Sequence, residues 1–287
     1  MTKGVLMSIR VVFLTLILLS IFVLILAAKS RQDYVLNTPL VEEASGLARS
    51  IKNASILYTH NDSGGENAIF AIDTRGRLKA KIEIAGVKNR DWEEIATGID
   101  PKDKQAYIYI GEIGDNGARY PHVSIYKVPE PSLSPKDSLI TLEGAECYNI
   151  QYDDGARDAE AFFVDPKSGD IYIISKREEQ VGIYQVTYPQ STTQMNIARK
   201  MGTMQMSWVT AADISPNGKR ILVKNYTGIR RFKLKKSIAH TLSQKGKNLP
   251  YKLEPQGEAI CFDAKGKAYF TLSEATEGSP QVLYYYK

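Results

Sequence analysis

Cysteine and histidine are scarce in this chain, which has two cysteines and three histidines among 287 residues. Common catalytic motifs are missing as well: there is no Gly-x-Ser-x-Gly, His-Glu-x-x-His, phosphate-binding loop or Cys-x-x-Cys pattern. Enzyme classes built on those motifs are therefore disfavoured. Cys147 and Cys261 each lie in an apolar or aromatic run, which favours buried free thiols, although in an oxidising compartment the two could pair.

The chain also lacks a large excess of either positive or negative charge. Setting aside Lys3 and Arg10 near the N-terminus leaves 35 of the 37 basic residues against 32 acidic ones. A balance of about +3 gives no general attraction to nucleic acid, and we expect no nucleic-acid partner. One segment differs, because Lys219 to Lys252 holds eleven Lys or Arg residues and no Asp or Glu. It is either a solvated edge or a surface for anionic lipid headgroups or another polyanion.

Acidic residues are absent from the first 28 positions, where an apolar run extends from Val11 to Ala28. About 18 apolar residues suffice to span a bilayer as a helix, whereas a signal peptide has an apolar stretch of roughly 7–15. We expect residues 1–32 to be a signal anchor that holds the chain in the cell membrane as a single-pass protein. Cleavage after Ala28-Lys29-Ser30 would instead make this segment a signal peptide and the rest of the chain a secreted protein. In either case, residues 33–287 are expected to form one extracytoplasmic domain.

Helical periodicity is absent from that domain. Short runs rich in Ile, Val, Tyr and Phe alternate apolar and polar positions, which is typical of strands. The breaks between them have the composition of tight turns. Their sequences are DPKDK (100–104), DPKSGD (165–170), SPNGK (215–219) and DAKGK (263–267).

One sequence unit recurs five times, each copy opening on an acidic motif and continuing into two further strands. The opening motifs are EEASGL (42–47), DWEEIA (91–96), RDAEAFFVDP (157–166), TAADISPNG (210–218) and QGEAICFDAKG (256–266). Repeats of this kind predict an all-β fold, a β-propeller preceded by one N-terminal apolar helix. Five blades are favoured, and there are six if Lys233–Glu254 hides another hairpin. The last unit stops after its third strand at Tyr286, so Asp33–Thr38 is expected to supply the missing fourth strand.

In a propeller, the start of each innermost strand and the loop after the second strand open on the same face. Acidic and amide side chains at these positions should therefore meet at the mouth of a central channel. The inner-strand starts contribute Glu43, Asp91, Glu93, Asp158, Glu160, Asp213 and Glu258. The second-strand ends contribute His60, Asn61, Asp62, Asp115, Asn116, Lys176, Arg177, Asn225, Ser273 and Glu274.

Such an oxygen-rich set suits a hard cation, and Ca²⁺ is the candidate cofactor because it takes about 6–8 oxygen ligands. A bound cation would also relieve repulsion between the carboxylates. Alternatively, the carboxylates cap backbone amides or pair with nearby arginines. The candidate metal ligands are Glu43, Asn61, Asp62, Glu93, Asp115, Asn116, Glu160, Asn225 and Glu258.

Catalytic residues are harder to predict. His60 is the one histidine beside the predicted mouth, and it would act as a general base if its pKa lay near the working pH. Glu93 and Glu160 are further candidates for proton transfer. A structural role is the alternative for each of the three.

The motifs DWEEIA, GEIGDNGAR, RDAEAFFVDP, TAADISPNG and QGEAI, taken in this order, resemble an exported bacterial β-propeller family that is mostly without assigned function. The resemblance covers residues from about Val41 to the C-terminus. The acidic and Asn residues are also similar in kind to those of gluconolactonase/regucalcin-type and phytase-type propellers, and this distant similarity implies Ca²⁺ or a related cation.

These observations leave two hypotheses about function. The first is a membrane-tethered propeller that binds a small molecule or a protein at its acidic face, with Ca²⁺ as the candidate cofactor. The second is a metal-dependent hydrolase of a lactone, ester or phosphoester, in which the cation polarises the substrate and a Glu or His60 moves the proton.

Overall fold

The computed structural model describes residue 13, residues 31–276 and residues 280–287. Within the two longer ranges almost all regular structure is β-strand, and the single helix is the short α2 (Ile238–Leu242). The predicted all-β class is confirmed. The apolar helix predicted at the N-terminus falls, apart from residues 13, 31 and 32, outside the described residues. Among the described residues, no helix has both the length and the apolar character needed to cross a bilayer.

The strands form five antiparallel units of four, each running from an inner to an outer strand. The first unit contains β2 (Ala44–Arg49), β3 (Ile56–Asn61), β4 (Ala68–Asp73) and β5 (Leu78–Ile84), and the second contains β6 (Trp92–Ile99), β7 (Ala106–Glu112), β8 (Val123–Pro129) and β10 (Glu146–Tyr152). The third contains β11 (Ala159–Val164), β12 (Ile171–Ser175), β13 (Val181–Val186) and β14 (Asn196–Met204). The fourth contains β15 (Val209–Ile214), β16 (Arg220–Asn225), β17 (Gly228–Lys233) and β18 (Lys247–Leu249). The fifth contains β19 (Ala259–Phe262), β20 (Tyr269–Leu272), β21 (Val282–Tyr286) and, at its outer edge, β1 (Arg31–Val35).

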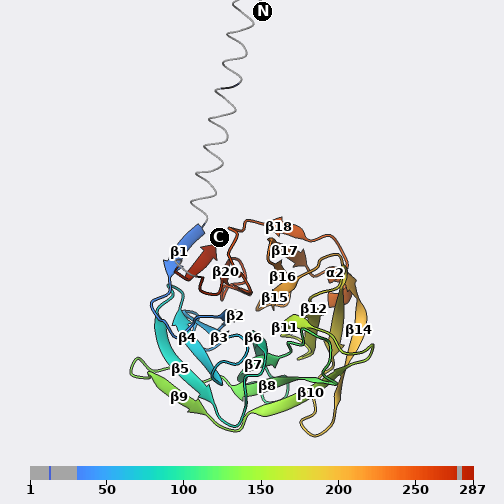
Figure 1. Cartoon of the computed structure of the whole chain (residues 1–287), viewed down its shortest axis with the longest axis horizontal. Helices are drawn as coiled ribbons and strands as arrows, with labels where there is room; N and C mark the ends of the chain where they lie inside the picture. Colours follow the sequence, from blue (N-terminus) through green and yellow to red (C-terminus); the bar gives the residue numbers. More distant parts are fainter. Residues whose placement is uncertain (1–12, 14–30, 277–279) are drawn as a thin grey trace, which may run out of the picture.

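The five inner strands form a closed ring around the centre of the molecule (Figure 1). Contacts link β2 to β6, β6 to β11, β11 to β15, β15 to β19, and β19 back to β2. The ring is completed by pairing of the two ends of the domain, since β1 lies antiparallel to β21 with Arg31 opposite Tyr286. The sequence predicted this closure for Asp33–Thr38, and the observed strand begins two residues earlier and ends at Val35.

Two parallel pairings connect neighbouring units at the periphery. The short strand β9 (Leu139–Leu142) lies beside β5. Strand β10 lies beside β14, which joins the second and third units into one eight-stranded sheet. The outer strands therefore support one another as well as their own units.

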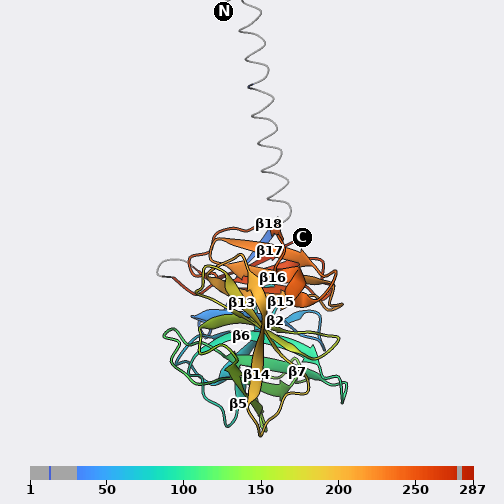
Figure 2. The same ribbon diagram turned by 90° about the vertical axis from the view of Figure 1, so that its right-hand side faces the viewer.

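The segment Lys233–Glu254, in which the sequence allowed a sixth blade, contains no additional four-stranded unit among the described residues. Lys233–Glu254 holds α2 and β18, and β18 pairs with β17 as the fourth strand of its unit. In both views β18 lies at the end of the molecule that also carries the C-terminus (Figures 1 and 2).

Burial explains why inner and outer strands differ in sequence. All six residues of β11 (AEAFFV) are buried, because an inner strand is packed between neighbouring units. Strand β8 (VSIYKVP), farther out, alternates buried and half-buried positions over its first half. The predicted turns are also present; for example, Asp263 Oδ1 accepts hydrogen bonds from the backbone N–H groups of Lys267 (2.7 Å) and Ala268 (3.0 Å).

The two thiols are free. Cys261 is fully buried, as predicted, whereas Cys147 is only half-buried.

Candidate metal centre

The inner strands share a β-bulge near their start. In four units one residue of the inner strand is skipped in the pairing with the second strand, and these residues are Ser45, Glu93, Glu160 and Thr210. Glu258, immediately before β19, occupies the corresponding position in the fifth unit, because Ala259 pairs with Leu272. A bulge re-aims a side chain and is common beside functional sites. Three glutamates therefore lie at equivalent positions around the ring.

A second set of equivalent residues directly follows the second strand of each unit. Asp62 follows β3, Lys176 follows β12, Tyr226 follows β16, and Glu274 follows Ser273 after β20. The second unit has the apolar Ile113 here. The second set thus places carboxylates in the first and fifth units and a cation in the third.

Two overlapping groups of carboxylates result from this arrangement. One oxygen from each of Asp62, Asp91 and Glu93 lies within 4.8 Å of the other two. The same is true of Asp62, Glu258 and Glu274. Asp62 is common to both groups, so side chains from the second, first and fifth units meet. We call these five residues the carboxylate cluster.

The carboxylate cluster lacks ion pairs within the described residues, although Glu258 and Glu274 accept side-chain hydrogen bonds. In the part of the chain that the structure describes, none of its members forms an ion pair with Lys or Arg. Glu93 is only 3% exposed, and no hydrogen bond from a described group reaches its carboxylate. Asp62 Oδ1 is likewise buried without a hydrogen-bond partner. Unpaired buried carboxylates are costly, so this group of side chains is a candidate site for a cation.

The same environment raises the pKa of these acids. Burial, followed by the charges of Glu258 and Asp91, raises the pKa of Asp62 to about 6. Burial and the charge of Glu258 raise the pKa of Glu274 to about 7. Burial raises the pKa of Asp91, and it raises that of Glu93 well above its usual value, with Asp62 adding to the shift. Desolvation and like charges favour the neutral acid, whereas a bound cation would favour the carboxylate.

Gly114 makes the close approach of Asp91 and Glu93 sterically feasible. A Cβ atom at this position would overlap Asp91 Oδ2 and Glu93 Oε1. The absence of a side chain at Gly114 leaves the space into which both carboxylates point.

The opposite side of the mouth is already neutralised. Lys176 Nζ donates a hydrogen bond to Glu160 Oε1 and another to the Tyr226 hydroxyl (3.2 Å), and this hydroxyl donates to Glu258 Oε1 (2.5 Å). Arg177 Nε similarly pairs with Asp158 Oδ2 at 2.5 Å. Arginine and lysine pairing therefore applies to the third unit, whereas the carboxylate cluster comes from the first, second and fifth units.

The structure brings together only part of the predicted ligand set. Asp62, Glu93 and Glu258 belong to the carboxylate cluster, while Glu43 is exposed nearby and its charge contributes to the raised pKa of Asp62. Asp91 and Glu274, which were predicted at the mouth but not chosen as ligands, complete the cluster.

The remaining candidates bind other protein groups. Asn61 Oδ1 accepts from the backbone N–H of Glu42 (3.0 Å), and Asp115 accepts from the backbone N–H groups of Arg119 and Tyr120. Asn116 Oδ1 accepts from Arg177, and Asn225 donates to the Ser207 carbonyl (3.1 Å). Glu160 is paired with Lys176. Amide groups predicted as ligands thus hold loops in place.

His60 lies in the wall of the ring. It is fully buried, its Nδ1 lies 2.9 Å from the Asn61 carbonyl oxygen, and its ring packs edge-on against Trp92 at 5.9 Å. Burial lowers the pKa of His60 to about 4, which keeps it neutral at pH 7. A solvent-facing general base requires a more open position than this.

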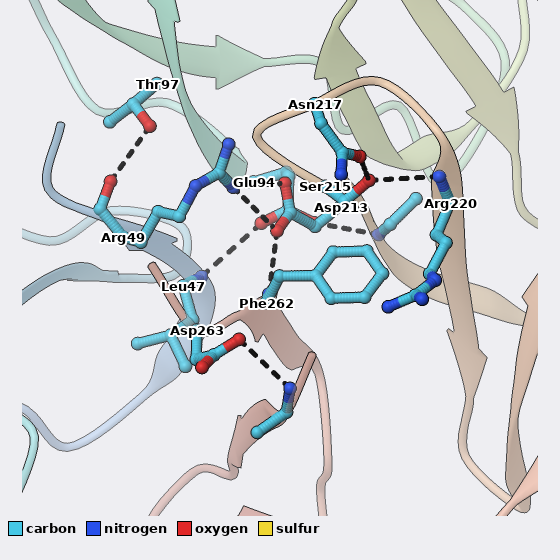
Figure 3. A network of polar contacts seen from close by, with 12 residues as sticks. Leu47, Arg49, Glu94, Thr97, Asp213, Ser215, Asn217, Arg220, Phe262 and Asp263 are labelled. Atoms are coloured by element: carbon cyan, nitrogen blue, oxygen red, sulfur yellow. Dashed lines mark hydrogen bonds and ion pairs between the residues drawn. The ribbon is translucent and has the colours of Figure 1, made fainter. Parts of the chain in front are cut away.

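Asp213 was predicted at the mouth, and this placement is wrong. Because of the bulge, Thr210 occupies the equivalent position, and Asp213 lies further along β15. There it pairs with Arg49 (3.0 Å) and accepts a hydrogen bond from the Phe262 backbone N–H (2.8 Å) (Figure 3).

Glu94 lies beside this pair and was not predicted as a functional residue. Its Oε1 accepts from the backbone N–H of Leu47 (3.4 Å) and its Oε2 from that of Ala212 (3.1 Å) (Figure 3). Arg49, Glu94 and Asp213 together connect inner strands across the centre of the ring.

Replacing Glu274 by glutamine is expected to make stability less dependent on pH. Since the pKa of Glu274 is about 7 in the folded chain and near 4.5 when unfolded, the folded state holds an extra proton between these values. Stability in the absence of cations should therefore fall as pH rises through 7. After allowance for solvent screening of this half-exposed group, the loss is about 1–2 kcal/mol.

Urea denaturation at pH 5 and pH 8 with a chelator would measure this effect. The variant should gain stability over the unsubstituted protein at pH 8 and little at pH 5. An equal difference at the two pH values would contradict the prediction.

No model of a known protein family matches the chain. Comparison with curated proteins finds no match either.

Proposed function

We propose that this chain is a five-bladed β-propeller that binds a divalent cation, Ca²⁺ by preference, at its mouth and through it a small-molecule or protein ligand. The architecture is supported by the five four-stranded units and the closed ring of inner strands. Cation binding is supported by one observation above all: the carboxylate cluster forms no ion pair with Lys or Arg of the described residues, and within it the buried Glu93 carboxylate and Asp62 Oδ1 accept no hydrogen bond from a described group.

The chemistry of the donors favours Ca²⁺. The carboxylate cluster offers only oxygen, without the imidazole or thiolate groups that zinc and copper sites use. Carboxylates bind Ca²⁺ through one or both oxygens. The three side chains of either group therefore leave coordination positions for water or a ligand. Such open positions are what a ligand-binding role needs.

Access to the cation is provided by a depression of 510 Å³ beside Asp91. Its lining includes Arg119 and Tyr120 from the loop after β7. A ligand that contacts the cation would therefore also touch a basic and an aromatic side chain.

We further propose that the apolar run Val11–Ala28 tethers the domain to the extracytoplasmic side of the cell membrane. Strand β1 starts at Arg31, shortly after that run. The proposed membrane segment would then directly precede β1, the strand that pairs with the C-terminal strand β21.

Thermal denaturation of the full chain in detergent, with excess Ca²⁺ and then with chelator, tests cation binding. At a Ca²⁺ concentration 100 times Kd, stabilisation is about 2.7 kcal/mol. For a domain of this size that corresponds to a rise in Tm of about 5–10 °C.

Asp62→Asn should abolish most of this rise, because Asp62 contributes to both groups of carboxylates. Glu143→Gln is the matched control, since Glu143 is an exposed carboxylate far along the sequence from the cluster, and its Ca²⁺ response should be unchanged. An unsubstituted protein whose Tm ignores both Ca²⁺ and chelator would rule out the proposal.

A metal-dependent hydrolase of a lactone, ester or phosphoester is the alternative that one observation favours. The Tyr226 hydroxyl lies between Lys176 and Glu258, a member of the cluster. A hydroxyl in this place could donate a proton to the leaving group of a substrate bound at the cation. A hydrolysis screen that stays negative with Ca²⁺, Mg²⁺ and Zn²⁺ would favour the binding role.

A further inference from the structure

We infer that the mouth holds two cations, bridged by Asp62, and this inference rests on the proposed cation-binding function. The carboxylate cluster is composed of two separate groups of three that share only Asp62. One ion would lie with Asp62, Asp91 and Glu93, and the other with Asp62, Glu258 and Glu274.

The spacing of the oxygens matches one ion for each group. Ca²⁺ lies about 2.3–2.6 Å from its ligands, so two oxygens on the same ion are at most about 5 Å apart. Oxygens within each group lie no more than 4.8 Å apart, which meets this limit. The five residues do not form a single group at that spacing, and one ion would leave two carboxylates without a metal contact.

The charge of the carboxylate cluster also favours two cations over one. When all five carboxylates are ionised, as they are when they bind cations, they carry a formal charge of −5, which one divalent cation reduces to −3 and two reduce to −1. No Lys or Arg of the described residues forms an ion pair with the cluster. A second cation would remove most of the repulsion that the first leaves behind.

Buried unpartnered groups lie where the two ions would bind. The Glu93 carboxylate, at 3% exposure, accepts no hydrogen bond from the described residues and belongs to the first group. Asp62, which both groups share, has its Oδ1 atom buried without a hydrogen-bond partner. A carboxylate between two ions is the arrangement that two-metal sites use to hold both cations at a short separation.

The two ions can be removed separately. Asp91→Asn changes only the first group, and Glu274→Gln changes only the second. Both side chains are partly exposed, and each substitution removes a repulsive charge while keeping the shape of the side chain. We therefore expect both variants to fold, which circular dichroism and the Tm in chelator would verify.

The experiment is to count Ca²⁺ bound per chain by equilibrium dialysis and by calorimetric titration of the full chain. Two ions are expected for the unsubstituted protein and for Glu143→Gln, and one for Asp91→Asn and for Glu274→Gln. Asp62→Asn should weaken binding of both ions at least about tenfold.

The number of Ca²⁺ ions bound per chain distinguishes the two-ion inference from the proposed function. A single ion per unsubstituted chain would overturn the two-ion inference and leave the proposed function standing. Absence of binding would overturn both.

Discussion

Replacing Arg49 by methionine is expected to destabilise the protein by about 3–5 kcal/mol, the typical cost of removing one partner of a buried ion pair. Arg49 and Asp213 have side chains only 10% and 13% exposed, and they meet at 3.0 Å in the centre of the ring (Figure 3). Burial already raises the pKa of Asp213, and Arg49 opposes that shift. Without the guanidinium, an ionised Asp213 would be left unpaired in the core.

Urea denaturation at pH 7 measures this loss, and Arg77→Met is the control. Arg77 pairs with Asp73 in the same way, but its side chain is 56% exposed, so its removal should cost about 0–1 kcal/mol. A double variant, Arg49→Met with Asp213→Asn, should recover part of the lost stability because it removes the orphaned charge. Equal effects of the two single arginine substitutions would show that the central pair does not hold the ring together.

Removing strand β1 should have an effect of similar size. A chain that begins at Leu36 loses the backbone hydrogen bonds along the pairing of β1 with β21 and the contact of the Arg31 guanidinium with the Tyr284 ring (5.4 Å). Each backbone hydrogen bond contributes about 0.5–1.5 kcal/mol, so the total loss is on the order of 5 kcal/mol. The open edge of β21 should also promote association between chains.

A chain that begins at Arg31 is the appropriate comparison, because it keeps β1 and lacks the same N-terminal apolar run. Both chains would be tested by urea denaturation and by size-exclusion chromatography. Indistinguishable midpoints for the two chains would mean that β1 does not contribute to closure of the ring.

The class of fold and its five units were predictable because their determinants are local. Alternating runs such as VSIYKV and turns such as DPKSGD specify strands and hairpins without reference to distant residues. Closure by the N-terminal segment was also predictable, since the last unit visibly lacked a fourth strand. Only the bounds of β1 differed: the strand begins two residues before the predicted segment and ends at Val35 instead of Thr38.

The membership of the carboxylate cluster was less predictable, because a β-bulge decides which residue of an inner strand is left out of the pairing with the second strand. Asp213 resembles the acidic residues of other units in its sequence motif, yet Thr210 takes the equivalent position in the structure. Asp91 and Glu274 were recognised at the mouth, but nothing in their local sequence distinguished them from Asp115, whose oxygens cap a turn.

The sequence by itself determined an all-β chain of five similar units with acidic residues concentrated at their strand starts. The tertiary structure alone decided which of those acids are paired. Glu160 is neutralised by Lys176 of its own unit, whereas Asp62, Glu93 and Glu258 come from three units and form no ion pair within the described residues. The reason is physical: whether a carboxylate is paired depends on the charges around it, and those are set by packing between units that are far apart in the sequence.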